Sequence, residues 1–170
     1  MPAKGKQKGN TGERLIADFL TNLFGHKFMR VPNSGAALGG KNAHRKQHLD
    51  ATQISYFKSD LIPPSHMQKL VIESKFYASF PFDKLAGNER IKQLDKWVEQ
   101  ILLTVEDEDV WFLVVRINRK GTWACFDKSW AAHFQLHNHV CHFDWIWCEF
   151  ETLFKHNKDV IIKLSDSTSA

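Results

Sequence analysis

The sequence predicts a single α/β domain in which a central mixed β-sheet is flanked by helices. The chain has 170 residues, of which 43% are hydrophobic and 25% are charged, as is typical of one globular domain with a substantial core. Its apolar patterns follow the order helix, strand, strand, strand, helix, strand, strand. Because each sheet face must be covered, this order favours a sheet packed between helices.

The first predicted element is a helix that follows a basic start. Residues 1–9 are basic and contain glycine, so we expect a disordered tail there. Asn10 or Thr11 can cap the helix and Gly25 can end it. An apolar stripe supports the helix and consists of Leu15, Ile16, Phe19, Leu20 and Leu23. A short strand and a turn should follow, over residues 26–35.

Positive charge is concentrated in the first third of the chain. Residues 1–48 contain nine Lys or Arg and two acids, whereas the remaining residues contain fourteen Lys or Arg and seventeen acids. Such a distribution suits a surface that meets a polyanion, although a solubilising tail would explain Lys4, Lys6 and Lys8 equally well. Residues 35–48 have three glycines and no apolar period, which predicts an exposed loop able to contact phosphates.

The centre of the chain brings acids and an amine into a short stretch. A strand is predicted over residues 50–62 with Asp60 near its end, and a second apolar strand ends in Glu73, Ser74 and Lys75. Alternation puts Glu73 and Lys75 on one side of that strand. If both segments lie side by side, Asp60 comes within reach of Glu73, and two carboxylates can hold a hard cation such as Mg²⁺. The alternative is an ordinary solvated strand end.

The second half of the chain predicts a helix, two strands and an aromatic tail. The helix starts at Asp83 or Asn88 and extends to about residue 105, and strands follow over residues 109–118 and from Gly121. Asp127 can cap a short helix. In the tail we expect a strand pair whose Trp and Phe residues pack on the core or in a dimer interface, with a zinc site among its His and Cys residues as the alternative. Three cysteines make a disulfide framework unexpected.

The pattern of Asp60 followed by Glu73-Ser74-Lys75 at the end of an apolar strand resembles the PD-(D/E)xK nuclease superfamily. The resemblance covers about residues 10–126 and implies a restriction-endonuclease-like core, with residues 127–170 as an added C-terminal extension. It implies that Asp60, Glu73 and the Ser74 carbonyl bind Mg²⁺, for which Mn²⁺ can substitute. Lys75 would orient the attacking water, and Glu13 on the first helix would assist the metal or its waters.

Within the superfamily the chain is most similar to the Holliday junction resolvases of archaeal and phage type. Arg30 and Ser34 resemble their Arg-x-x-x-Ser-Gly segment, and Gln93 with Trp97 resembles a Gln-x-x-x-Tyr element in which Trp replaces Tyr. Gln93 would then hold a phosphate or Lys75. The resemblance implies a homodimer acting on four-way DNA. The expected DNA contacts are Arg30, Ser34, Lys41, Arg45 and Lys46.

The sequence therefore predicts a Mg²⁺-dependent DNA endonuclease, most similar to a junction resolvase. One alternative is a repair or restriction-type nuclease of the same superfamily. Others are a DNA-binding protein without turnover and a zinc-binding interaction module. No apolar run reaches the roughly 18 residues of a membrane span, and the basic N-terminus is not followed by a signal-like apolar stretch, so a cytoplasmic location is expected.

Overall fold

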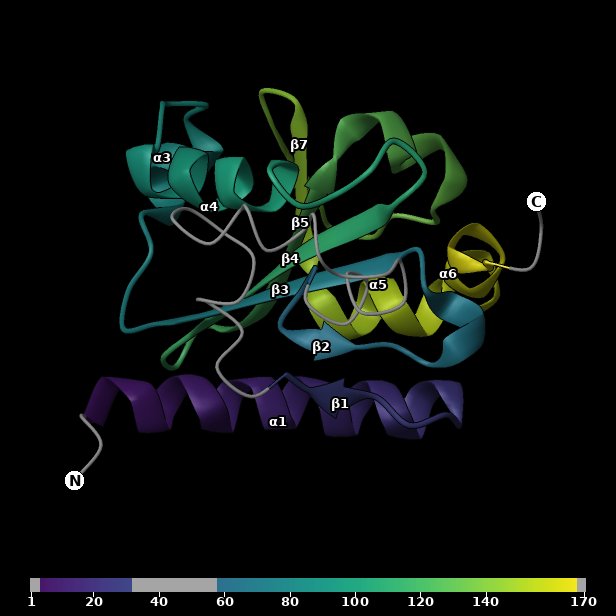
Figure 1. Cartoon of the computed structure of the whole chain (residues 1–170). Coiled ribbons are helices and arrows are strands. Elements are labelled where there is room, and N and C mark those ends of the chain that lie inside the picture. The colour runs from purple at the N-terminus through teal and green to yellow at the C-terminus, as the bar shows by residue number, and fades with distance from the viewer. Residues whose placement is uncertain (1–3, 32–57, 168–170) are drawn as a thin grey trace.

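A five-stranded mixed sheet forms the centre of the molecule, which confirms the predicted α/β class (Figure 1). The computed structural model describes residues 4–31 and 58–167, with side chains from Thr11 onward. The strand order is β3-β4-β5-β7-β6, in which β3 and β4 are parallel and all other neighbours are antiparallel. The strands are β3 (Leu70–Tyr77), β4 (Val110–Ile117), β5 (Gly121–Asp127), β6 (Val140–His142) and β7 (Trp145–Glu149).

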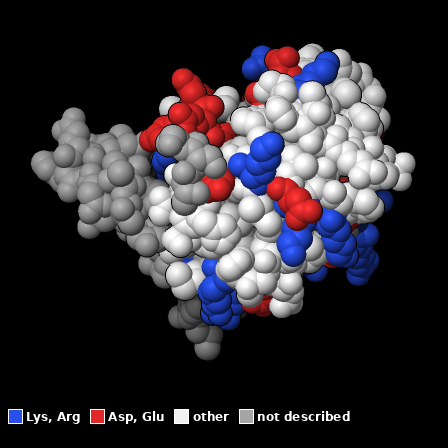
Figure 2. Space-filling model, turned by 90° about the vertical axis from the view of Figure 1, so that its right-hand side faces the viewer, with Lys and Arg blue, Asp and Glu red and all other residues white. Residues whose placement is uncertain are grey.

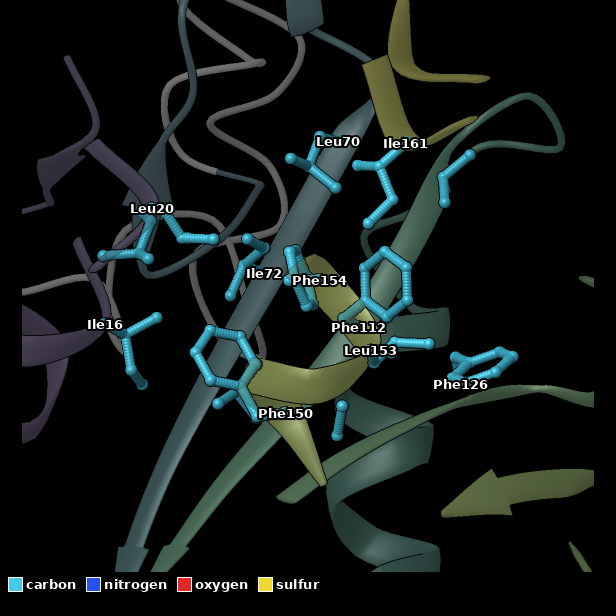
Figure 3. Close-up of a cluster of buried hydrophobic side chains, with 14 of the residues drawn as sticks. Ile16, Leu20, Leu70, Ile72, Phe112, Phe126, Phe150, Leu153, Phe154 and Ile161 are labelled. Atoms are coloured by element: carbon cyan, nitrogen blue, oxygen red, sulfur yellow. The ribbon is translucent and has the colours of Figure 1, made fainter. Parts of the chain in front are cut away.

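Helices cover both faces of this sheet, as its alternating side chains require. The elements on one face are α1 (Lys4–Phe24), α5 (Phe150–His156) and α6 (Lys158–Ser165). The other face carries α3 (Phe82–Ala86) and α4 (Lys92–Leu102), which connect the parallel strands β3 and β4. Figure 3 shows how Ile72 and Phe112 of the sheet meet Ile16 of α1 and Phe154 of α5 in the first of two apolar clusters.

A second, two-stranded sheet lies beside α1 and the edge strand β3. It pairs β1 (Met29–Arg30) with β2 (Leu61–Ile62) in antiparallel register, so that Arg30 lies opposite Leu61. Two 3₁₀ helices complete the described elements, η3 (Ser65–Met67) and η4 (Lys128–His133). The short sheet matters for function because it brings Arg30 and the residue before Leu61 close to β3.

Two helices differ from the expectation. The first, α1, begins at Lys4, so most of the predicted disordered tail over residues 1–9 is helical. Lys and Gln are good helix formers, and the helix passes close to β3 at Gly12, where an added Cβ would lie 3.0 Å from Phe76 Cδ2. The predicted helix from residue 83 or 88 is divided into α3 and α4, because Asn88 adopts a left-handed conformation (φ 54°).

The C-terminal residues complete the sheet and core. Strand β7 pairs with β5, and Phe150 and Phe154 of α5 are buried in the main apolar cluster. The predicted boundary after residue 126 thus falls between strands that are hydrogen-bonded to each other in one sheet. The strand pair predicted in the tail is confirmed as β6 and β7. Asp127 accepts a hydrogen bond from the Ser129 N–H at 2.8 Å, as a cap should, but the helix that it begins is 3₁₀.

Several further expectations concern metal, disulfide and membrane features. All three cysteines are free thiols. Within residues 4–31 and 58–167, no group of three or more His, Cys, Asp and Glu side chains is arranged to hold a metal ion, including the histidines of the tail. Across the same residues no helix combines the length and apolar character needed to cross a bilayer. The predicted strand up to residue 57 and the loop over residues 35–48, with Ser34, Lys41, Arg45 and Lys46, lie outside the described residues.

Candidate active site

Asp60 lies on the open edge of β3, next to the acid and the amine of that strand. Its N–H donates to the Ile72 carbonyl at 3.2 Å, and its Oδ2 accepts a hydrogen bond from the Ser74 N–H at 2.8 Å. In a strand the N–H and C=O of one residue point to the same side, so the Ser74 carbonyl faces this edge too. The predicted approach of Asp60 to Glu73 is therefore found, although the neighbouring β2 pairs with β1 and not with β3.

Glu73 and Lys75 form a closed set of hydrogen bonds with Gln100 of α4. Lys75 Nζ donates to Glu73 Oε1 at 2.6 Å and to Gln100 Oε1 at 3.1 Å. Gln100 Nε2 donates to the same Glu73 oxygen at 3.0 Å. Because α4 packs on the face to which Glu73 and Lys75 point, it brings this amide against both groups. The ammonium is thereby held in one orientation beside the buried carboxylate.

Gln100, and not Gln93, makes these hydrogen bonds. Gln93 lies in the first turn of α4, seven residues before Gln100, which is two helical turns or roughly 10 Å along the axis. Trp97, the expected counterpart of a tyrosine, is buried, and its ring lies 4.8 Å from that of Tyr77. A period of seven puts Gln93 and Gln100 on one helix face. The sequence could have indicated Gln100 as well as Gln93 on that ground. It did not decide between them, because it predicted two alternative starts for the helix.

A third carboxylate and its partner approach the same edge from the other side of the sheet. Glu13 of α1 forms an ion pair with Arg30 of β1. Both side chains are largely buried, with 15% of Glu13 and 21% of Arg30 exposed. Glu13 is close enough to Asp60 and Lys75 to interact with them electrostatically. The structure thus places Arg30, which the sequence predicted as a DNA contact, directly beside the carboxylates.

The carboxylates raise the proton affinity of the site. The pKa of Glu73 is raised from 4.5 to about 7, first by burial and then by the negative charge of Asp60, while Lys75 lowers it in part. The pKa of Glu13 is also raised, chiefly by burial, although the hydrogen bond from Arg30 opposes this. Two neighbouring acids that resist losing their protons indicate a place where additional positive charge would be favourable.

The donor set of this edge fits a hard divalent cation. Asp60 and Glu73 offer carboxylate oxygens, the Ser74 carbonyl faces the same edge, and Asp60 and Glu73 are both buried. Mg²⁺ prefers such oxygen ligands and keeps several waters, so two carboxylates suffice. Glu13 is engaged with Arg30 and does not complete a three-carboxylate group with Asp60 and Glu73. The residues that would hold the cation are therefore Asp60, Glu73 and Ser74.

The chain was also compared with models of known protein families. The family model described as "Phage putative PDDEXK endonuclease" matches residues 4–166, almost the whole chain. The chain belongs to this family. PD-(D/E)xK nucleases generally use divalent metal ions, and the substrate of an endonuclease of this family is DNA. The comparisons with curated proteins and with solved structures gave no match.

Family membership accounts for the main features of the PD-(D/E)xK fold described above. The helix before the sheet, the parallel strands β3 and β4 with α3 and α4 between them, and the five-stranded mixed sheet agree with a restriction-endonuclease-like core. The description of the family names no particular DNA structure. Nuclease activity thus follows from the family, whereas the preferred DNA and the roles of single residues require their own arguments.

Proposed function

We propose that this PD-(D/E)xK protein is a Mg²⁺-dependent endonuclease whose active site is the open edge of β3. The observation that carries the proposal is the meeting of Asp60 with Glu73 and Lys75, fixed by the hydrogen bond from the Ser74 N–H to the Asp60 carboxylate. A divalent cation bound by Asp60 and Glu73 would stabilise the charge that develops on the phosphate and activate a water. The remaining groups position the reactants around it.

Lys75 is proposed to orient the attacking water. An ammonium has three N–H donors, of which Glu73 and Gln100 take two, so the third can donate to a water beside the scissile phosphate. Gln100 fixes Lys75 by accepting from it, and fixes the Glu73 oxygen by donating to it. The amide therefore takes the role that the sequence assigned to Gln93, namely holding Lys75.

Glu13 and Arg30 are proposed to act together at the phosphate. An Arg guanidinium matches the geometry of a phosphate, and its present partner Glu13 keeps it within the site. Glu13 can assist the waters of the metal from the side of α1. This assignment keeps the expected roles of both residues, with Arg30 contacting DNA at the reacting group.

The proposed substrate is a four-way DNA junction, cut by a homodimer. Its support is the resemblance of the Arg30 and Ser34 segment to junction resolvases and the excess of Lys and Arg in residues 1–48. Resolvases cut two opposed strands, which a two-fold dimer would present to two sites. The face shown in Figure 2 carries basic and acidic side chains side by side, so it is not a uniformly basic surface.

Cleavage of a labelled four-way junction and of its matched linear duplex tests this proposal. Wild type and Glu73→Ala are compared with and without Mg²⁺. Paired symmetric nicks on the junction alone, lost in the variant and without metal, are the expected result. Metal-dependent cleavage of the duplex at equal rate would instead favour a repair or restriction-type nuclease, and no cleavage of either DNA would favour a DNA-binding protein.

Binding and cleavage should separate in two further variants. Asp60→Asn and Lys75→Ala remove groups of the reacting site and leave the basic N-terminal third intact, so junction affinity should be largely retained while cleavage is lost. A gel-shift titration in Ca²⁺ and a cleavage assay in Mg²⁺ measure the two properties. Equal loss of both would contradict this division of roles.

A further inference from the structure

Lys58 is a partly buried lysine that lies only two residues before Asp60. Its side chain is 10% exposed, and its Nζ lies 3.0 Å from Asp109 Oδ2 and 3.1 Å from Glu106 Oε2. Asp109 is itself almost entirely buried, with 4% of its side chain exposed. Removing two charges from water is costly unless they are paired, so this ion pair is a built feature of the fold.

The partner of Lys58 is held in a braced turn. Asp109 Oδ2 accepts a second hydrogen bond from the Glu106 N–H at 2.8 Å, and the Asp109 N–H donates to the Glu106 carbonyl at 2.9 Å. The next residue, Val110, begins β4 and is bonded to the Lys69 carbonyl. Lys58 is therefore attached to a hydrogen-bonded turn at the start of β4, next to the start of β3.

Asp60 lies outside the strands, in a bend just before β2. Its N–H and its carboxylate form hydrogen bonds with Ile72 and Ser74 of β3, and its carbonyl accepts one from the Val31 N–H at 2.9 Å. Ser59, between Lys58 and Asp60, is buried and forms a local turn with Leu61. The segment 58–60 is consequently fixed at one end by Lys58 and at the other by the hydrogen bonds of Asp60.

We propose that Lys58 is a positioning residue: its ion pair with Asp109 fixes the segment 58–60 and so keeps the Asp60 carboxylate on the Ser74 amide, ready to bind a divalent cation. The placement of Asp60 stands by itself, whereas its consequence for metal binding rests on the proposed function. Groups that orient metal ligands in this way typically contribute about 10-fold to 100-fold in metal affinity.

Lys69 offers a matched control. It lines the same cavity of about 450 Å³ as Lys58 and also pairs with an acid, Glu108, at 2.8 Å. Glu108 is 75% exposed, however, and Lys69 belongs to the chain just before β3, not to the segment that carries Asp60. Lys69→Met therefore removes the same charge from the same cavity without releasing Asp60.

The experiment uses the full-length, metal-free protein with two readouts. The first is the hydrogen-exchange rate of the Ser74 amide by NMR, relative to the amides of β4, and the second is Mn²⁺ affinity by calorimetry. In Lys58→Met we expect the exchange rate of Ser74 to rise about 10-fold more than the rates of the β4 amides, and Mn²⁺ to bind about 10-fold more weakly. Lys58→Arg should restore both values, and Lys69→Met should leave both unchanged.

The outcomes separate the two proposals. Unchanged Ser74 exchange in Lys58→Met, or an equal increase over all β4 amides, would overturn the positioning role. A second outcome is that Lys58→Met speeds exchange selectively at Ser74 but the wild-type protein binds no Mn²⁺. This result would support the positioning role of Lys58 and contradict the proposed metal site. Should Lys58→Met fail to fold, Asp109→Asn removes the same ion pair, and the same selective increase at Ser74 is expected there.

Discussion

Two groups of buried charged residues lie on either side of the segment 58–60, and they are balanced differently. On one side Lys58 pairs with Asp109, whose Oδ2 also accepts a hydrogen bond from the Glu106 N–H. On the other side Glu73 and Asp60 share their surroundings with Lys75, and the pKa of Glu73 stays raised at about 7. The buried part of the first group is one acid with one lysine, since Glu106 beside Lys58 is 71% exposed, whereas the second group has two acids beside one lysine.

This difference distinguishes a structural ion pair from a site. Complete pairing makes the folded chain the best environment for both charges, so removing one partner leaves the other buried and unpaired. Where carboxylates outnumber the cations beside them, neutralising one acid relieves repulsion between like charges. Such a substitution should therefore lower the free energy of unfolding little or not at all. The same Asp or Glu to amide substitution should therefore have opposite consequences in the two groups.

The largest expected effect is on cleavage by Glu73→Gln. The amide keeps the shape and the oxygen that accepts from Lys75 and Gln100, but it loses the charge needed to hold a cation. We expect DNA cleavage in Mg²⁺ to fall by about a hundred-fold to a thousand-fold. Thermal unfolding of the same metal-free variant should be unchanged or at higher temperature. A clear loss of stability would mean that Glu73 forms a structural ion pair, like Asp109, and not part of a cation site.

Asp109→Asn should do the reverse and destabilise the fold. It leaves Lys58 with only the exposed Glu106 as a charged partner, for which a cost of about 3 kcal/mol in the free energy of unfolding is expected. Urea unfolding against wild type measures it. Glu108→Gln, which alters the exposed pair with Lys69, serves as control and should change stability by less than about 1 kcal/mol. Equal effects of the two substitutions would remove the contrast between the groups.

The pH dependence of stability should report on Glu73. Its pKa in the folded protein is about 7 against an ordinary value of 4.5, so the folded state binds the proton more tightly. Protonation of Glu73 therefore contributes roughly 3 kcal/mol to the free energy of unfolding. This contribution is fully present below about pH 4.5 and is lost as the pH rises through 7. Urea midpoints of metal-free protein between pH 5 and 8 measure the slope, which Glu73→Gln should abolish.

The smallest effect separates Gln100 from Gln93. Gln100→Leu removes one hydrogen bond to Lys75 and one to Glu73, so we expect cleavage to fall by about 10-fold. Gln93→Leu, on the same helix but two turns earlier, should leave the rate within about twofold. Single-turnover cleavage rates compare the two. A larger loss in Gln93→Leu would restore the role that its place in the sequence first indicated.

The contrast between these two glutamines shows what the sequence could and could not predict. Local patterns predicted β3 and β4 correctly, because the run from Leu70 to Ile72 and that from Val110 to Ile117 are apolar enough to be buried whatever surrounds them. Of the strand predicted over residues 50–62, by contrast, residues 58–60 form a bend and Leu61–Ile62 is a strand. The patterns also placed Asp60 beside Glu73. The choice between Gln93 and Gln100 depends on where α4 begins and how it crosses β3, which is fixed by the left-handed Asn88 and by packing of Trp97.

Long-range contacts set the rest of the site. The hydrogen bonds between Lys58 and Asp109 and between Lys75 and Gln100 join residues 51 and 25 positions apart, and no local period links them. The pairing of the C-terminal strands is long-range in the same way, since β7 joins β5 across an intervening helix and β6. Patterns of burial predict elements, but the partners of polar groups emerge only from their packing.

Asp60 also closes the exposed border of the sheet. An unpaired edge strand offers its N–H and C=O groups to any other extended chain, which is a common start of aggregation. At β3 the carboxylate of Asp60 occupies the Ser74 N–H, and its own N–H occupies the Ile72 carbonyl. Substitutions that shorten this side chain would expose a template for strand addition, so Asp60→Asn should stay in solution during purification better than Asp60→Ala.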